Sequence, residues 1–306
     1  MQIIQGSAAF PPALHGAVLT MGNFDGVHIG HQTICRDVVA KARGWGCASV
    51  AYTFDPHPLR VLAPALQLTM LQTVPQRLQA LAAAGLDATV VEPFTPEIAA
   101  LPPQAFLTEI LWQRLRPRAV VIGYDFTFGQ RRAGRVADLE RFGAEHKLQV
   151  DVIEPVFCGP ILVSSTYLRH CIEQGDVEAA ATALGRPYTI GGTLVTGRGV
   201  GRQLGFPTLN VRSSNELLPA TGVYVTWALH AATQLPAVTY VGHNPTFGGT
   251  GLVVETHLLT ACPPDITQLE VSFLRRLRGD IHFECVDDLT RQIAQDVAAA
   301  RAYHQL

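Results

Sequence analysis

The chain has 306 residues, 48% of them hydrophobic and 16% charged, a composition typical of a folded globular protein long enough for two domains. The formal net charge of −2 provides no overall field that would recruit nucleic acid or an anionic membrane, so we expect neither as a partner. Only Lys41 and Lys147 are lysines, and neither completes a GxxxxGK[ST] motif, which excludes that phosphate-binding loop.

The six cysteines are scattered without a CxxC pair, a pattern that favours neither a zinc site nor a disulfide framework. The first basic residue is Arg36, so the amino terminus lacks the charged region of a secretory signal. No apolar run reaches the roughly 18 residues of a membrane helix. We therefore expect a protein of the reducing cytoplasm.

The first half alternates strand-like apolar runs with helical stretches. The runs are 17–21, 48–54, 88–91, 119–122 and 149–153, and the helical stretches are 31–43, 74–84, 103–114 and 137–146. This alternation predicts an α/β domain with a parallel sheet and crossover helices. Ligands of such sheets bind in the loops at the carboxyl ends of the strands, so those loops are the candidate sites.

The pattern changes after a helical stretch over 167–184, which ends at Gly185-Arg186-Pro187. We place the domain boundary there, giving residues 1–186 and 187–306. Short β-branched and aromatic runs at 188–195, 222–229, 237–241, 253–259 and 269–273 predict a small β-barrel or sandwich. The last segment, 286–304, is predicted to be a helix, because its apolar residues recur at helical spacing: Leu289, Ile293, Val297 and Ala300. Asp287 and Asp288 near its start favour a helix amino terminus.

The segment GNFDGVHIGH (residues 22–31) lies between a predicted strand and a predicted helix. Gly22, Gly26 and Gly30 allow the backbone to approach a ligand closely, and His28 and His31 stand together at the helix start. The N–H groups there attract phosphate, and two imidazoles can donate hydrogen bonds to charge developing on a phosphoryl group. The alternative is a glycine turn with two surface histidines.

Three further loops follow strand-like runs or precede a helix: FDPHP (54–58), GYDFTFG (123–129) and SSTYLR (164–169). In the last, Ser164 or Ser165 can cap a helix while Arg169 reaches a phosphate as a delocalised cation. Taken singly, each loop also fits an ordinary turn or cap, with Phe126 and Phe128 packed in the core.

The second half contains GRGVGRQLGFPTLN (197–210), in which the glycines permit a loop folded over a phosphate. Thr208 and Asn210 offer neutral oxygens of the kind that hydrated Mg²⁺ accepts. Glu255 alternates with apolar neighbours on a predicted strand, where a carboxylate can accept a hydroxyl proton during phosphoryl transfer. A glycine-rich hairpin and a surface glutamate are the alternatives.

The order and spacing of GNFDGVHIGH, TFDPHP, GYDFTFG with RRAG, and SSTYLR resemble the adenylyltransferase module of bacterial bifunctional riboflavin kinase/FAD synthetases. The resemblance implies a Rossmann-like HxGH nucleotidyltransferase domain, in which the phosphate of FMN attacks the α-phosphorus of ATP and pyrophosphate leaves. His28 and His31 would be catalytic. The implied ATP-binding residues are Gly22, Asn23, Phe24, Gly30, Ser164, Ser165, Thr166 and Arg169, and the implied flavin-binding residues are Asp55, Pro56, Asp125, Phe126 and Phe128.

GRQLGFPTLN, Gly222-Val223-Tyr224, NPTFG (244–248) and VVETHLL (253–259) resemble the riboflavin kinase module of the same family, which implies a six-stranded antiparallel barrel. The implied roles are Glu255 as general base toward riboflavin, Thr208 and Asn210 at the Mg²⁺–ATP site, and Gly205 and Pro207 as ATP contacts. ATP, riboflavin, FMN and FAD are then the substrates and products.

Two departures lie in the kinase half. Val200 replaces the first arginine of the family's Arg-Gly-Arg, and Asp265-Ile266-Thr267-Gln268 replaces Asp-Leu-Tyr-Gly. An FMN adenylyltransferase with a degenerate, flavin-binding kinase domain is therefore the alternative function. In the first half, Tyr124 stands where the family often has an acidic or small residue.

Overall fold

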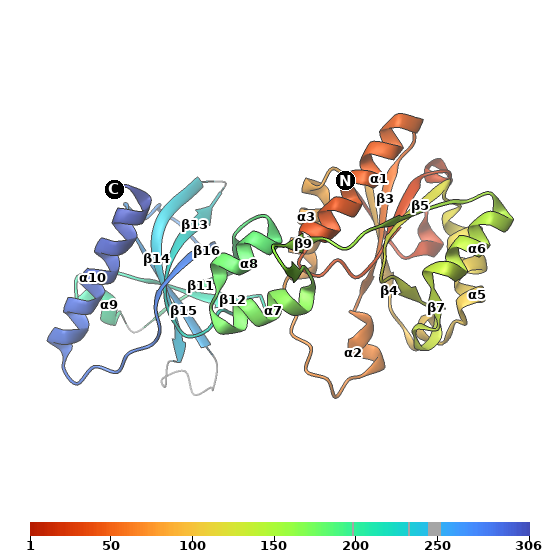
Figure 1. Cartoon of the computed structure of the whole chain (residues 1–306). Coiled ribbons are helices and arrows are strands. Elements are labelled where there is room, and N and C mark those ends of the chain that lie inside the picture. The colour runs from red at the N-terminus through yellow and green to blue at the C-terminus, as the bar shows by residue number, and fades with distance from the viewer. Residues whose placement is uncertain (198, 232, 244–251) are drawn as a thin grey trace. The chain divides into compact units, whose positions relative to one another are not determined.

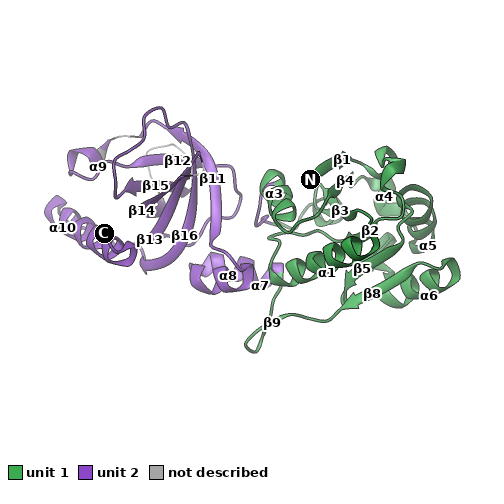
Figure 2. Ribbon diagram, turned by 90° about the horizontal axis from the view of Figure 1, so that it is seen from above, with its two compact units in different colours: residues 1–68, 74–164 green, residues 69–73, 165–306 purple. Residues whose placement is uncertain are grey.

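The computed structural model describes residues 1–197, 199–231, 233–243 and 252–306, which fall into two compact units. The first unit comprises residues 1–68 and 74–164, and the second comprises residues 69–73 and 165–306 (Figure 2). The predicted NPTFG segment lies outside the described residues.

A six-stranded parallel sheet forms the centre of the first unit (Figure 1). In sheet order its strands are β1 (Gln2–Gln5), β4 (Ala88–Pro93), β3 (Ser49–Asp55), β2 (Val18–Met21), β5 (Ala119–Gly123) and β8 (Gln149–Ile153). From β2 the chain continues to β3 on one side, whereas β5 lies on the other, so the strand order reverses beside β2. This is the position where open α/β sheets bind their ligands, and the GNFDGVHIGH segment begins directly after β2.

Successive residues of a strand point to opposite faces of the sheet. Since successive residues of these strands are buried, both faces of the sheet must be covered. Helices α1 (Ile29–Trp45) and α3 (Val74–Ala83) pack on one face through Val38, Ala42 and Leu81. The π-helix η3 (Phe106–Leu115) and helix α6 (Val136–His146) cover the other face. The predicted α/β organisation is thereby confirmed.

Shorter elements complete the first unit. They are helices α2 (Pro58–Leu62), α4 (Pro96–Ala100) and α5 (Pro103–Ala105), the 3-10 turns η1 (Ser7–Ala9), η2 (Pro12–Leu14) and η4 (Gln130–Arg132), and the strand pairs β6 (Thr127–Phe128) with β7 (Gly134–Arg135) and β9 (Phe157–Cys158) with β10 (Ile161–Leu162). The predicted helical stretch 103–114 is thus largely a π-helix preceded by one short α-helical turn.

The second unit is a closed antiparallel barrel of six strands (Figure 1). Around the barrel they run β11 (Tyr188–Val195), β12 (Leu209–Ser213), β15 (Leu252–Leu258), β14 (Thr233–His243), β13 (Gly222–His230) and β16 (Gln268–Arg278). The barrel implied by the family resemblance is confirmed. Strand β12 was not predicted; it begins with the last two residues of the GFPTLN motif.

Helix α10 (Val286–His304) packs on the outer wall of the barrel and has the bounds predicted for the last segment. Ala300 is fully buried against Val223, Val225 and Val238. The remaining helices of this unit are α7 (Ser165–Gln174), α8 (Val177–Leu184) and α9 (Val200–Gln203).

The single predicted helix over 167–184 is wrong: the structure has the two helices α7 and α8. Gly175 adopts a left-handed conformation (φ 75°) between them, and the Asp176 side chain accepts a hydrogen bond from the N–H of Ala179 as the cap of α8. The left-handed glycine ends α7, and the aspartate cap begins α8. Among the described residues, no helix is long and apolar enough to cross a membrane.

Candidate active sites

The turn between β2 and α1 brings His28 and His31 into direct contact. His28 is the N-cap of α1, and its Nδ1 accepts a hydrogen bond from the N–H of His31 (3.3 Å). The two rings are stacked, with centroids 3.7 Å apart and planes at 16°. Gly30 makes this packing possible, since a Cβ there would stand only 3.1 Å from His28 Nδ1.

The electrostatics of this pair favour a neutral His31 imidazole. Burial, and secondarily the charge of His28, hold the pKa of His31 well below its usual 6.5. The Nδ1 atom of His31 is buried and has no hydrogen-bond partner among the described residues. An uncharged ring with an unused nitrogen at a helix amino terminus is suited to receive a ligand group.

The same turn contains strained backbone. Phe24 and Val27 have positive φ values of 52° and 40°, which non-glycine residues rarely adopt. Phe24 is buried, its ring contacts His31 edge-on at 5.2 Å, and it packs against Gly22, where a Cβ would lie 3.2 Å from the ring. The predicted residues Gly22, Asn23, Phe24, Gly30 and the two histidines therefore share one short connection.

An aromatic cavity of about 190 Å³ lies in the first unit. Five phenylalanines line it: Phe54, Phe94, Phe106, Phe126 and Phe128. Phe126 and Phe128 are stacked, with centroids 5.6 Å apart. Asn23, from the histidine turn, and Arg132 also line the cavity. A flat apolar ring system fits such walls.

Two of the five predicted flavin contacts, Phe126 and Phe128, line this cavity, whereas the other three, Asp55, Pro56 and Asp125, are exposed and outside its lining. Phe54 belongs to the predicted FDPHP loop but was not assigned to the flavin, and sequence reasoning missed Phe94 and Phe106, which occur on separate elements and carry no shared motif. Ser164 belongs to the first unit, and Ser165, Thr166 and Arg169 belong to the second. Within the second unit, Arg169 donates from Nε to the carbonyl of Thr69 (2.7 Å).

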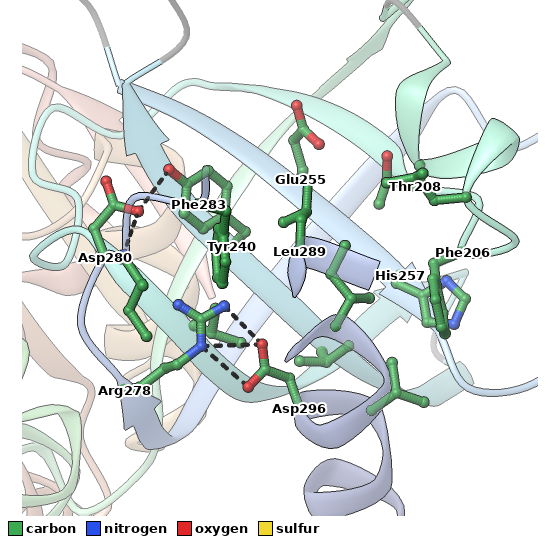
Figure 3. A pocket seen from close by; sticks show the side chains of 17 residues that line it. Phe206, Thr208, Tyr240, Glu255, His257, Arg278, Asp280, Phe283, Leu289 and Asp296 are labelled. Carbon is green, nitrogen blue, oxygen red and sulfur yellow. Dashed lines mark hydrogen bonds and ion pairs between the residues drawn. The ribbon is translucent and has the colours of Figure 1, made fainter. Parts of the chain in front are cut away.

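The second unit has a cavity of about 280 Å³ between the outer wall of the barrel and α10 (Figure 3). Glu255 and Thr208 lie at one end of it, and the paired side chains of Arg278 and Asp296 lie at the other. The middle is apolar, with Val223, Val238, Leu289, Ile293 and Val297 among the lining residues.

The three polar residues predicted for phosphoryl transfer are brought together. Asn210 on β12 is the direct cross-strand partner of Glu255 on β15, and Thr208 lines the same cavity as Glu255. Burial raises the pKa of the Glu255 carboxyl above its usual range, partly offset by a hydrogen bond from Thr208. A half-buried carboxylate with a raised pKa is a better proton acceptor than a solvated one.

The GFPT loop is anchored around these residues. His257 Nδ1 is 2.8 Å from the carbonyl of Pro207, and Phe206 packs edge-on against the same imidazole. Gly205 is left-handed (φ 86°), and Gly197 leaves room for the Asn210 side chain, into which a Cβ at that position would project. Sequence reasoning missed Arg278 and Asp296, which form an ion pair at 2.8 Å in which Asp296 is buried and Arg278 is partly buried.

Comparison with known proteins finds two family models that match different parts of the chain. The family model for FAD synthetase matches residues 10–167, and the model for riboflavin kinase matches residues 184–304. Proteins named bifunctional riboflavin kinase/FMN adenylyltransferase are similar over essentially the whole chain. The one from Escherichia coli K12 is 32% identical, covering 100% of this chain and 99% of that protein, and the one from Pseudomonas fluorescens is 34% identical, covering 99% and 97%.

A solved structure from Streptococcus pneumoniae, titled a macrolide-efflux protein, has a TM-score of 0.90 and 27% identity, covering 98% of this chain and 99% of that chain. The fold and these comparisons define a two-unit transferase. The chain belongs to the family of bifunctional riboflavin kinases/FMN adenylyltransferases. Both enzyme activities expected from the sequence resemblance are thereby confirmed.

Proposed function

We propose that the two reactions occur at the two sites described above, adenylyl transfer in the first unit and riboflavin phosphorylation in the second. The functional boundary at residues 186/187 is part of this proposal. The observation that carries it is that each unit contains its own cavity beside a loop predicted from sequence to bind phosphate.

In the first unit, the amino terminus of α1 would bind the phosphates of ATP, through Gly22, Asn23, Phe24 and Gly30. The FMN phosphate oxygen attacks the α-phosphorus of ATP, the bond to the β-phosphate oxygen breaks, and pyrophosphate leaves. His28 and His31 would donate hydrogen bonds to the charge that develops on the phosphoryl oxygens. The lowered pKa of His31 keeps its ring neutral, so this ring has one N–H to donate.

The aromatic cavity would hold the isoalloxazine ring of FMN between Phe126, Phe128 and Phe54. Asn23 lines this cavity and also belongs to the histidine turn, so the proposed flavin and ATP sites adjoin there. Asp55, Pro56 and Asp125 stay predicted flavin contacts. Ser164, Ser165, Thr166 and Arg169 stay predicted contacts of the ATP phosphates.

In the second unit, Glu255 would accept the proton of the ribityl 5′-hydroxyl while that oxygen attacks the γ-phosphorus of ATP and ADP leaves. The apolar middle of the cavity would accept the flavin ring. Gly205 and Pro207 would contact ATP through the loop that His257 anchors.

The oxygens of Thr208 and Asn210 fit Mg²⁺, which binds few protein ligands and shares the others with water and substrate phosphates. When bound, the ion neutralises charge on the transferred phosphoryl group. We further propose that both steps use freely diffusing ATP and flavins in the cytoplasm, without nucleic-acid or membrane partners.

Purified protein incubated with riboflavin and Mg·ATP tests the proposal when the flavins are separated by chromatography over time. We expect FMN to rise first and FAD to follow. Conversion of added FMN to FAD without any FMN formation from riboflavin would instead favour the degenerate kinase domain, for which Val200 and Asp265-Ile266-Thr267-Gln268 are the supporting features.

A further inference from the structure

Arg77 on α3 is a buried cation that neither reaction uses. Only 2% of its surface is exposed. Its Nη1 donates to the carbonyl of Asn23 (3.0 Å), and its Nη2 donates to the carbonyl of Phe54 (2.9 Å). The two carbonyls belong to different connections, since Asn23 follows β2 and Phe54 is next to the last residue of β3.

Both acceptors lie at the predicted adenylyl-transfer site. Asn23 immediately precedes Phe24, the first strained residue of the histidine turn, and both Asn23 and Phe54 line the aromatic cavity. The hydroxyl of Thr53 also donates to the Asn23 carbonyl, at 3.2 Å. Arg77 itself does not line the cavity, so it contacts its wall from behind.

Burying a charged arginine costs free energy, which a purely structural link between two segments would not require. Burial lowers the pKa of its guanidinium, an effect opposed by the nearby carboxylates of Asp25 and Asp55. Its Nε is buried without a hydrogen-bond partner among the described residues. What the guanidinium offers in return is a rigid fork, whose two ends fix two separate main-chain segments at a set spacing.

We propose that Arg77 is a positioning residue for adenylyl transfer, holding the phosphate-binding turn at Asn23 and the flavin cavity wall at Phe54 in a fixed relation. It acts through these two carbonyls and touches neither substrate. The inference rests on the proposed adenylyl-transfer site. Because the proposed site binds ATP at the Asn23 turn and the flavin ring at the Phe54 wall, a small shift between the two segments would misalign the attack.

The test compares Arg77→Lys and Arg77→Met with the unchanged protein, measuring kcat and KM for ATP and FMN in FAD synthesis. A lysine has one donor group in place of the fork, so we expect kcat for FAD synthesis to fall by about 10- to 100-fold, with raised KM for both substrates. FMN formation from riboflavin by the same samples should be unchanged. Arg36→Gln, at an exposed arginine that bonds only within α1, is the matched control and should behave as wild type.

A purely structural role predicts a different result: kcat would fall in proportion to the folded fraction measured by circular dichroism, with both KM values unchanged. That result would overturn the inference, as would wild-type kinetics in a folded Arg77→Lys variant. If Arg77→Met does not fold, the lysine variant decides alone. Failure of the unchanged protein to make FAD from FMN would instead refute the proposed function.

Discussion

Replacing Glu255 by Gln removes the proposed base of the kinase step and leaves the size of the side chain unchanged. General-base catalysis contributes about 100- to 10,000-fold, so the rate of FMN formation should fall by that factor, equivalent to roughly 3–5 kcal/mol in the activation barrier. Burial already disfavours the charged form of Glu255, so a neutral amide at this position should not destabilise the barrel.

The assay follows FMN formation from riboflavin, with FAD formation from added FMN as the internal control in the same sample. Glu270→Gln is a matched control, since Glu270 also lies on a barrel strand but does not line the cavity. Because burial raises the pKa of Glu255 above its ordinary 4.5, the wild-type rate should decline on acidification at a higher pH than an unperturbed glutamate would cause. An unchanged rate in Glu255→Gln would refute the assignment.

Gly30→Ala should slow FAD synthesis about tenfold and spare the kinase, because its Cβ would push the His28 ring out of the stacked pair; steady-state kinetics check this, and equal losses at both steps would argue against it. The first unit should lose thermal stability as the pH falls from 6.5 toward the lowered folded-state pKa of His31, since only the unfolded chain then binds the proton; a midpoint of unfolding unaffected by pH in this window would disprove the shift. Asp296→Asn should destabilise the second unit by about 3 kcal/mol, because it breaks the ion pair between the buried Asp296 and Arg278. Asp288→Asn, at an exposed ion pair, should change the free energy of unfolding by less than about 0.5 kcal/mol. Denaturant titrations measure both changes.

The elements with strong periodicity were predictable from sequence. β11 and α10 have the predicted bounds, because alternating or helical apolar spacing continues up to a clear boundary. β14 is longer than its apolar run, since it begins at Thr233 and continues through Pro236. Pairing with β13 makes these first residues part of the strand, although the local sequence pattern does not indicate one. β1 was missed because it is four residues long and only Ile4 is buried.

The candidate sites were predictable where one short segment carries the chemistry. His28 and His31 meet because a strand-to-helix turn places residues three apart at one helix end. Arg77 and the pair of Arg278 with Asp296 carried no comparable signal: their partners are distant in sequence, and only the folded chain brings them together. An arginine within an otherwise unremarkable helical stretch gives no indication of being buried.

Labelled ATP tests the central claim, that this chain performs one transfer at the γ-phosphorus and another at the α-phosphorus of ATP. Riboflavin is incubated with the protein and with ATP labelled at either position, and the flavins are then separated. The account predicts that γ-label appears in FMN, and that FAD carries γ-label on its flavin phosphate and α-label on its adenylyl phosphate. FMN without γ-label, or FAD without α-label, would contradict the account.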